Sequence, residues 1–142
     1  QIIINHVLDG IAIARKNKLP DRVIDFIRTH HGDSSVYYFY KKQLELDPDN
    51  THIEDFQYPG PRPFSKENAI LMMADAVEAA SKSLKSPDIE QLKHFIEKIV
   101  TSKMNALQFN NSNITLSEIE TVKKVLLRKL INVYQLRIEY PE

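Results

Sequence analysis

The chain has 142 residues, 42% hydrophobic and 27% charged, which is ordinary for a globular domain with a modest core. Its 19 Lys and Arg residues balance 19 Asp and Glu residues, so no net field attracts a DNA or RNA polymer or an anionic membrane surface. No stretch approaches the roughly 18 apolar residues of a membrane span, and the absence of cysteine fits a reducing cytosol. We expect residues 1–142 to form a single domain.

The first predicted helix covers about residues 1–17. Its apolar positions recur every three or four residues, as on one face of a helix: Ile3, Val7, Gly10, Ile11 and Ala14. His6 stands beside that stripe. The chain opens within an apolar run, without a methionine, a targeting segment or a helix cap, so we expect further sequence ahead of it.

The second predicted helix begins with Pro20 in its first turn and runs to a pair of adjacent histidines, His30 and His31, where Gly32 ends it. Neighbouring side chains on a regular helix point about 100° apart, so this pair converges on one centre only where the helix stops. Together with His6, the pair suggests a divalent-metal site. The alternative is a histidine placed near a helix C-terminus by the helix dipole.

A third helix is predicted over about residues 35–46, with aromatic side chains in the core and in the wall of a groove. Residues 47–63 follow as a long irregular segment that ends in Tyr58-Pro59-Gly60-Pro61-Arg62-Pro63. Long ordered loops are often functional, and Arg62 is a candidate for bidentate contact with a phosphate. The alternative is a rigid connector with Arg62 in solvent.

The fourth helix is predicted over about residues 66–84, with Ser65 as its cap. Asp75 interrupts an almost entirely apolar run, and an ionised carboxylate in a core helix needs a cation or hydrogen-bond donors. A metal, a salt bridge or backbone N–H groups would satisfy it. Glu78, one turn on, shares this polar patch or faces water. Lys66 opposes the helix dipole, so an anionic ligand or a carboxylate is expected near it.

Two more amphipathic helices complete the prediction of an all-α fold with about six helices. Ser86-Pro87-Asp88 reads as a cap and first-turn proline before a helix to about residue 107. A capping box from Thr115 to Glu118 opens the last helix, to about residue 137. Its broad apolar stripe can pack internally or form a homodimer surface. His52 and His94 have no convincing ligand neighbour and are left out of the site.

Five segments of the chain, spanning nearly its whole length, resemble the C-terminal part of the HD phosphohydrolase domain of seven-transmembrane HD proteins. The characterised members of that family are PgpH-type cyclic di-AMP phosphodiesterases, and the present sequence is most similar to Bacteroidetes-like members. The block that joins YPGPRP to ILMMADAVEAASKSL is specific, whereas HHG alone would be weak. The segments are IIINHVLDG, LPDRVIDFIRTHHG, YFYKK, YPGPRPFSKENAILMMADAVEAASKSL and RIEYP.

The resemblance implies an HD-domain-like helical bundle that lacks the N-terminal HD-motif helices. It implies two divalent ions, iron or manganese, in the complete domain, with one held by three histidines and a carboxylate on the other. The matching residues are His6, His30, His31 and Asp75. Family members carry an upstream histidine and a metal-bridging His-Asp pair, and no His-Asp dipeptide occurs here.

One position departs from the family pattern. Relatives tend to read HHG followed by threonine and serine, whereas this chain has Gly32-Asp33-Ser34-Ser35. The departure puts in doubt any substrate contact assigned to this loop.

The function implied is hydrolysis of a cyclic dinucleotide, cyclic di-AMP, to the linear dinucleotide. Two cations would clamp the phosphate and activate a hydroxide, and Arg62, Lys66 and Glu78 are the candidate substrate contacts. The resemblance places the parent protein at the bacterial inner membrane, with transmembrane helices elsewhere and this soluble part on the cytoplasmic face, inactive alone. The alternatives are a non-catalytic nucleotide-sensing or interaction module and an HD phosphohydrolase for another nucleotide.

Overall fold

The computed structural model describes residues 2–135, and the regular secondary structure in this range is helical. Ser35 and Gln57 form an isolated antiparallel bridge, and no strand is present among these residues. None of the helices found there is both long and apolar enough to cross a membrane. The all-α prediction is confirmed. The elements are α1 (Ile2–Lys16), α2 (Asp21–Thr29), α3 (Tyr37–Leu46), the 3-10 helices η1 (Pro48–Asn50) and η2 (Ile53–Phe56), α4 (Lys66–Ser81), α5 (Ile89–Asn105) and α6 (Leu116–Val133).

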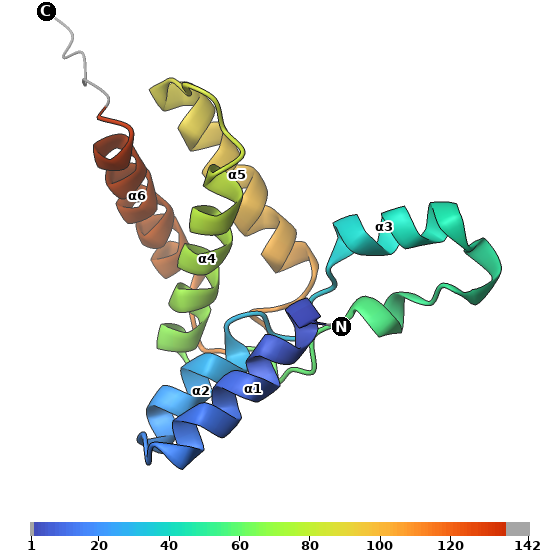
Figure 1. Ribbon diagram of the computed structural model, residues 1–142. Coiled ribbons are helices and arrows are strands. Elements are labelled where there is room, and N and C mark those ends of the chain that lie inside the picture. Colours follow the sequence, from blue (N-terminus) through green and yellow to red (C-terminus); the bar gives the residue numbers. More distant parts are fainter. Residues whose placement is uncertain (1, 136–142) are drawn as a thin grey trace, which may run out of the picture.

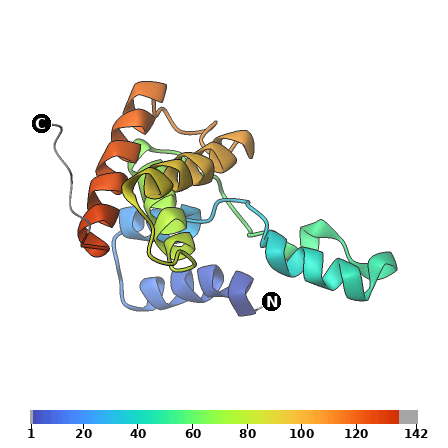
Figure 2. The ribbon, with the colours of Figure 1, turned by 90° about the horizontal axis from the view of Figure 1, so that it is seen from above.

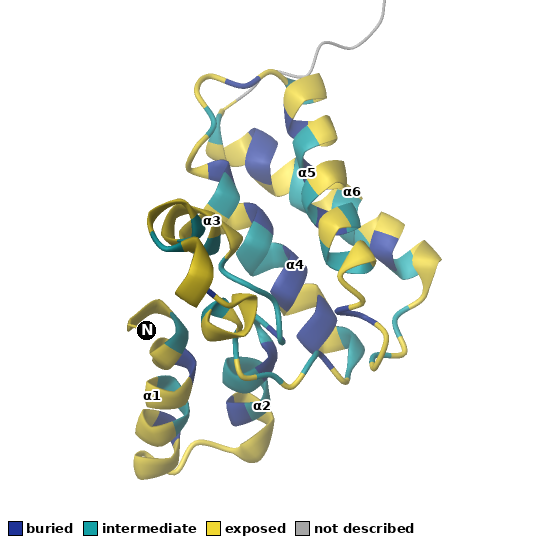
Figure 3. Cartoon of the chain, turned by 90° about the vertical axis from the view of Figure 1, so that its right-hand side faces the viewer, coloured by how far each residue is buried: buried dark blue, intermediate teal, exposed yellow. Residues whose placement is uncertain are grey.

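Helix α4 is the centre of the arrangement, because it contacts α2 on one side and both α5 and α6 on the other. Helices α1 and α2 pack side by side at one end of the molecule (Figure 1). The main core lies where α4, α5 and α6 meet, and the buried faces of these helices turn toward one another (Figure 3). Its fully or almost fully buried members are Ala69, Met72, Met73, Val77, Leu92, Ile96 and Val100.

The prediction of a core helix holds for α4, but this helix is not buried on every side. Ile70 and Leu71 are exposed, and the side chain of Asp75 keeps 37% of its surface accessible. The apolar run is longer than the buried face needs, since only one face of α4 meets α5 and α6. Asp75 therefore lies at the edge of the core and opens toward solvent.

The prediction that the third helix contributes aromatic residues to the core is wrong. Helix α3 has no buried residue, and together with η1 and η2 it forms an arm, residues 36–58, that projects from the bundle (Figures 1 and 2). The arm packs on itself, with the rings of Tyr40 and Phe56 5.9 Å apart. Tyr37, Tyr38 and Phe39 remain exposed at its base.

Most predicted helix starts are confirmed by their caps. The Ser65 hydroxyl accepts the N–H of Asn68 at the start of α4, and the Thr115 hydroxyl accepts the N–H of Glu118 at the start of α6. For α5 the cap is Asp88 rather than Ser86: Asp88 and Gln91 form a reciprocal capping box. Helix α6 ends at Val133, and the predicted last turn at 136–137 lies outside the residues described.

The core predicts a clear contrast between two leucines. Leu92 is fully buried, so Leu92→Ala should lower the free energy of unfolding by about 2–5 kcal/mol through lost burial and the cavity left behind. Leu116 is 69% exposed, and Leu116→Ala should change it by less than about 0.5 kcal/mol. Urea denaturation followed by circular dichroism measures both, and equal effects would contradict the assigned core.

Candidate metal centre

The structure brings the three predicted histidines together, from two different helices. His6 lies on α1, His30 is the residue that caps the end of α2, and His31 follows in the turn. One ring nitrogen of each lies within 4.8 Å of the others. Because the helix has ended at this point, the two adjacent rings need not diverge by a helical step, and their centroids are 4.0 Å apart.

Backbone carbonyls set the tautomers of two of these rings. Nδ1 of His30 donates to the carbonyl of Ile27 at 2.7 Å, and Nδ1 of His6 donates to the carbonyl of Ile3. A carbonyl oxygen only accepts, so each Nδ1 carries the proton and each neutral ring keeps its lone pair on Nε2. The two Nε2 atoms face each other at 3.3 Å. In neutral rings this geometry points two lone pairs at each other, and a metal ion or a proton between them stabilises it.

This donor set fits a divalent transition metal. Neutral imidazoles suit zinc, iron and manganese. A metal-bound histidine usually donates its other ring N–H to a carbonyl or a carboxylate, which fixes the orientation of the ring. Two nitrogens bound to one zinc ion at about 2.0–2.1 Å lie roughly 3–3.4 Å apart. The 3.3 Å separation of the His6 and His30 nitrogens fits that range.

His31 is held in the neutral form that a metal ligand needs. Burial, followed by the nearby His30, His6 and Lys103, lowers the pKa of His31 to about 3. At neutral pH its 3.6 Å separation from Asp75 is therefore not an ion pair, because the imidazole carries no charge. The His31 ring stacks on Tyr58, with centroids 4.3 Å apart and 21° between the planes.

Beside the histidines lies a cleft of about 680 Å³, between the base of the arm and helices α4 and α5. Asp75 and Lys103 give it one carboxylate and one ammonium group. Burial lowers the pKa of Lys103, and the carboxylate of Asp75 opposes that shift. Burial, and then the charge of Asp75, raises the pKa of Tyr58. The aromatic wall consists of Tyr37, Tyr38, Phe39 and Tyr58.

Arg62 does not line this cleft. Its Nε donates to both carboxylate oxygens of Asp33 at 3.0 Å, so the side chain is paired rather than free in solvent. Burial disfavours the Asp33 carboxylate, but the hydrogen bonds from Arg62 and Gln108 hold its pKa below the usual range. Arg62 is thus committed to the loop that follows the histidine pair.

Lys66 and Glu78 also lie outside the cleft. The ammonium group of Lys66 pairs with Glu118 at 3.1 Å, which supplies the nearby carboxylate expected for a lysine at a helix start. Glu78 pairs with Lys82 one turn along α4 at 3.0 Å. The structure therefore brings neither side chain to the three histidines.

The sequence reading missed Lys103 and assigned no role to Tyr58. A signal for Lys103 existed, because it follows Leu92, Ile96 and Val100 at helical spacing and so occupies an apolar-face position of α5. Tyr58 could not be assigned, since its stacking on His31 depends on how the arm returns to the bundle.

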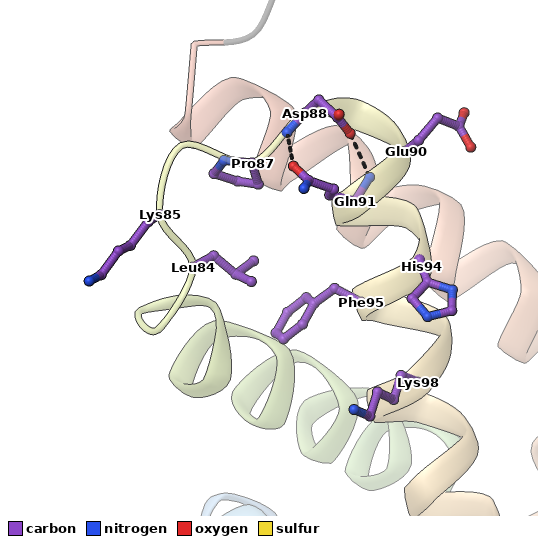
Figure 4. A pocket seen from close by; sticks show the side chains of 9 residues that line it. All are labelled: Leu84, Lys85, Pro87, Asp88, Glu90, Gln91, His94, Phe95 and Lys98. Atoms are coloured by element: carbon purple, nitrogen blue, oxygen red, sulfur yellow. Dashed lines mark hydrogen bonds between the residues drawn. The ribbon is translucent and has the colours of Figure 1, made fainter.

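A second hollow lies where α4 passes into α5 (Figure 4). It is lined by Leu84, Phe95, Lys98 and a single histidine, His94, together with the cap of α5. The carboxylate of Asp88 is used in that cap. Within residues 2–135, the three clustered histidines are the group of three or more side chains able to hold a metal, so the omission of His94 from the site agrees with the structure.

Comparison with known proteins identifies the family of the chain. The family profile of the HD domain matches residues 1–80. The chain is 40% identical over 141 residues to the cyclic-di-AMP phosphodiesterase PgpH of Bacillus subtilis and 36% identical over 141 residues to that of Listeria monocytogenes. Each match covers 99% of this chain and 20% of the relative, so the chain spans about a fifth of the curated relatives' length.

A solved structure agrees with the fold. The HD domain of L. monocytogenes PgpH, in complex with cyclic-di-AMP, superimposes with a TM-score of 0.90 at 36% identity. The superposition covers 98% of this chain and 65% of that one.

The low pKa of His31 predicts acid sensitivity of the metal-free protein. In the unfolded chain His31 takes up a proton at about pH 6.5, whereas in the folded protein it stays neutral down to about pH 3. Stability from this group is present above pH 6.5 and is lost as pH falls toward 3, by up to about 1.4 kcal/mol per pH unit. His31→Gln should flatten the dependence of the urea midpoint on pH, whereas exposed His52→Gln should not. An unchanged slope in His31→Gln would refute the assignment.

Proposed function

Because this chain belongs to the HD domain family, we propose that it supplies the metal-binding part of a phosphodiesterase that hydrolyses a cyclic dinucleotide. The observation that carries the proposal is the facing pair of Nε2 atoms of His6 and His30, 3.3 Å apart and both acceptors. Such a pair is stable around a cation. The adjoining cleft has room for a nucleotide.

His6, His30 and His31 would hold one divalent ion, and Asp75 would bind a second one. Iron or manganese is proposed, since both accept imidazole and carboxylate ligands. When bound, the ions supply a clamp on the phosphate and a hydroxide nucleophile. The carboxylate that bridges them would come from a His-Asp pair, a dipeptide that this sequence does not contain. We therefore propose that the 142 residues alone are inactive.

Cyclic di-AMP is the proposed substrate, with the linear dinucleotide as product. Two relatives carry the name cyclic-di-AMP phosphodiesterase, and the solved relative holds cyclic-di-AMP. The cleft offers chemistry suited to such a ligand. Tyr37, Tyr38 and Phe39 expose ring faces on which a base can stack, and Lys103 offers charge to a phosphate.

The protein's own residues have separable tasks in this scheme. Lys103 would offset phosphate charge at the inner wall of the cleft. Tyr58 would keep the His31 ring in one plane by stacking on it at 4.3 Å. The carbonyls of Ile3 and Ile27 accept from Nδ1 of His6 and His30 and would leave Nε2 of each neutral ring as the metal-binding nitrogen.

We place the domain at the cytoplasmic face of the bacterial inner membrane, attached to transmembrane helices elsewhere in the protein. The relatives' greater length and the zero net charge here support covalent attachment over docking on anionic lipid. A homodimer is proposed through α6, on which Val125 and Val133 are exposed.

A non-catalytic nucleotide-sensing module is the second candidate, favoured by the missing His-Asp dipeptide. It would bind the nucleotide in the same cleft without turnover. An HD phosphohydrolase acting on another nucleotide is the third, and it would differ in the bases that the aromatic wall accepts.

The metal proposal predicts one ion per chain. Isothermal titration of the metal-free protein with Mn²⁺ should give at most one site, and His30→Ala should abolish it because the facing nitrogen is lost. His94→Ala, which removes a histidine at the far hollow, should bind like the wild type. Two tight sites in these residues, or full binding by His30→Ala, would contradict the ligand assignment.

Turnover is tested in the protein as it occurs in the cell, with its upstream sequence, Mn²⁺ and cyclic di-AMP. Lys103→Gln should lower kcat/KM by about ten- to a hundredfold, the loss expected for one charge-assisted hydrogen bond. Lys98→Gln, on the same helix but in the other hollow, should be neutral. Product chromatography measures both. Nucleotide binding without any turnover by the wild type would favour the sensing module.

A further inference from the structure

Three side chains from distant parts of the sequence join at the loop that follows the histidine pair. Nε of Arg62 donates a hydrogen bond to both carboxylate oxygens of Asp33 at 3.0 Å. Nε2 of Gln108 donates to Oδ1 of the same carboxylate at 2.6 Å. Oε1 of Gln108 in turn accepts the backbone N–H of Asp33 at 3.3 Å. We call Asp33, Arg62 and Gln108 the loop clamp.

The clamp leaves its members little freedom. Gln108 is 2% exposed, and its amide is satisfied by Asp33 and by the carbonyl of Ala106. Gly32 has a φ of +55°, and a Cβ there would lie 2.1 Å from Oε1 of Gln108. Only glycine fits this position, so the buried amide and the turn after the histidines fix each other's place.

Backbone bonds extend the same junction to the returning arm. The N–H of Gly60 donates to the carbonyl of Gly32 at 3.0 Å, and the N–H of Tyr58 donates to the carbonyl of Ser34 at 2.9 Å. The side chain of Gln57 donates to the carbonyl of Asp33 at 2.7 Å. The loop therefore has the arm's return on one side and Gln108 on the other.

This junction reaches the histidines directly. The hydroxyl of Ser34 donates to the carbonyl of His31 at 2.7 Å, and Tyr58, held by the same strand-like pairing, stacks on the His31 ring. Only Gly32 separates Asp33 from His31, while the other two members lie 31 and 77 positions away (62 − 31 and 108 − 31). Displacing Asp33 would thus move both the loop carrying His31 and the ring packed on it.

We propose that Asp33, Arg62 and Gln108 are positioning residues that aim His30 and His31 at His6. The proposal deepens the proposed function, because it makes the metal affinity of the histidines depend on an ion pair that touches no metal. It also assigns Arg62 to the protein rather than to a phosphate.

The test compares Asp33→Ala, Arg62→Ala and the double variant with Glu97→Gln, which breaks a distant ion pair with Lys123 of 2.9 Å. In the metal-free protein, ¹H–¹⁵N spectra of the imidazoles should show shifted His30 and His31 resonances in both single variants. Co²⁺ affinity should fall about ten- to a hundredfold, the range for outer-shell partners of metal ligands, with an altered d–d absorption spectrum. Glu97→Gln should change neither.

Two further arms keep the outcome clear. Asp33→Asn retains an acceptor for Gln108 and should recover part of the Co²⁺ affinity, and the double variant should lose no more than Asp33→Ala does. Wild-type imidazole resonances and Co²⁺ affinity in Asp33→Ala would overturn the proposal. If the wild type itself binds no Co²⁺, the proposed function fails, and the metal-free imidazole spectra still decide whether the clamp positions the rings.

Discussion

The candidate site depends on one geometric constraint, the approach of the Nε2 atoms of His6 and His30 to 3.3 Å. Backbone carbonyls accept from the Nδ1 atoms of both rings and so fix the side of each ring that faces the other. Two helices must be held together to keep these rings in place. The contact between α1 and α2 does this, and Val7 and Ala14 of α1 are buried. The helices are close at Gly10, where a Cβ would lie 3.1 Å from Cγ2 of Ile27.

The remaining candidate ligand, Asp75, is placed by a different part of the molecule. It lies on α4, whose opposite face is anchored in the core by Met72, Met73 and Val77. A side chain on a rigid helix keeps its position at a small entropic cost. The histidine pair, in contrast, lies at a helix end, where the loop beyond it must be held by side-chain bonds. The clamp at Asp33 meets that need.

The local sequence predicted what depends on local physics. Helical spacing and caps located six helices, and the glycine after the histidine pair located the helix end. Prediction failed where distant segments decide the outcome. Asp75 lies in an apolar run that suggests burial, but the helices packed on α4 leave its side chain partly exposed. The aromatics of α3 read as core, yet their helix belongs to an arm that packs on itself. The ion pair of Arg62 was not predicted either, because its partner Asp33 lies 29 residues away.

The match to the HD family covers residues 1–80, whereas Lys103 and Gln108 come from the helix and loop beyond it. The second half of the chain therefore contributes side chains to the cleft and to the loop beside it. Among the side chains lining the cleft, Asp75 and Lys103 carry opposite formal charges, and His31 is neutral. Their charges cancel, so a bound divalent ion would make the cleft positive while the chain as a whole stays near zero. Attraction for a phosphodiester would then arise at the cleft alone and only when metal is present, which suits a small anion better than a nucleic-acid polymer.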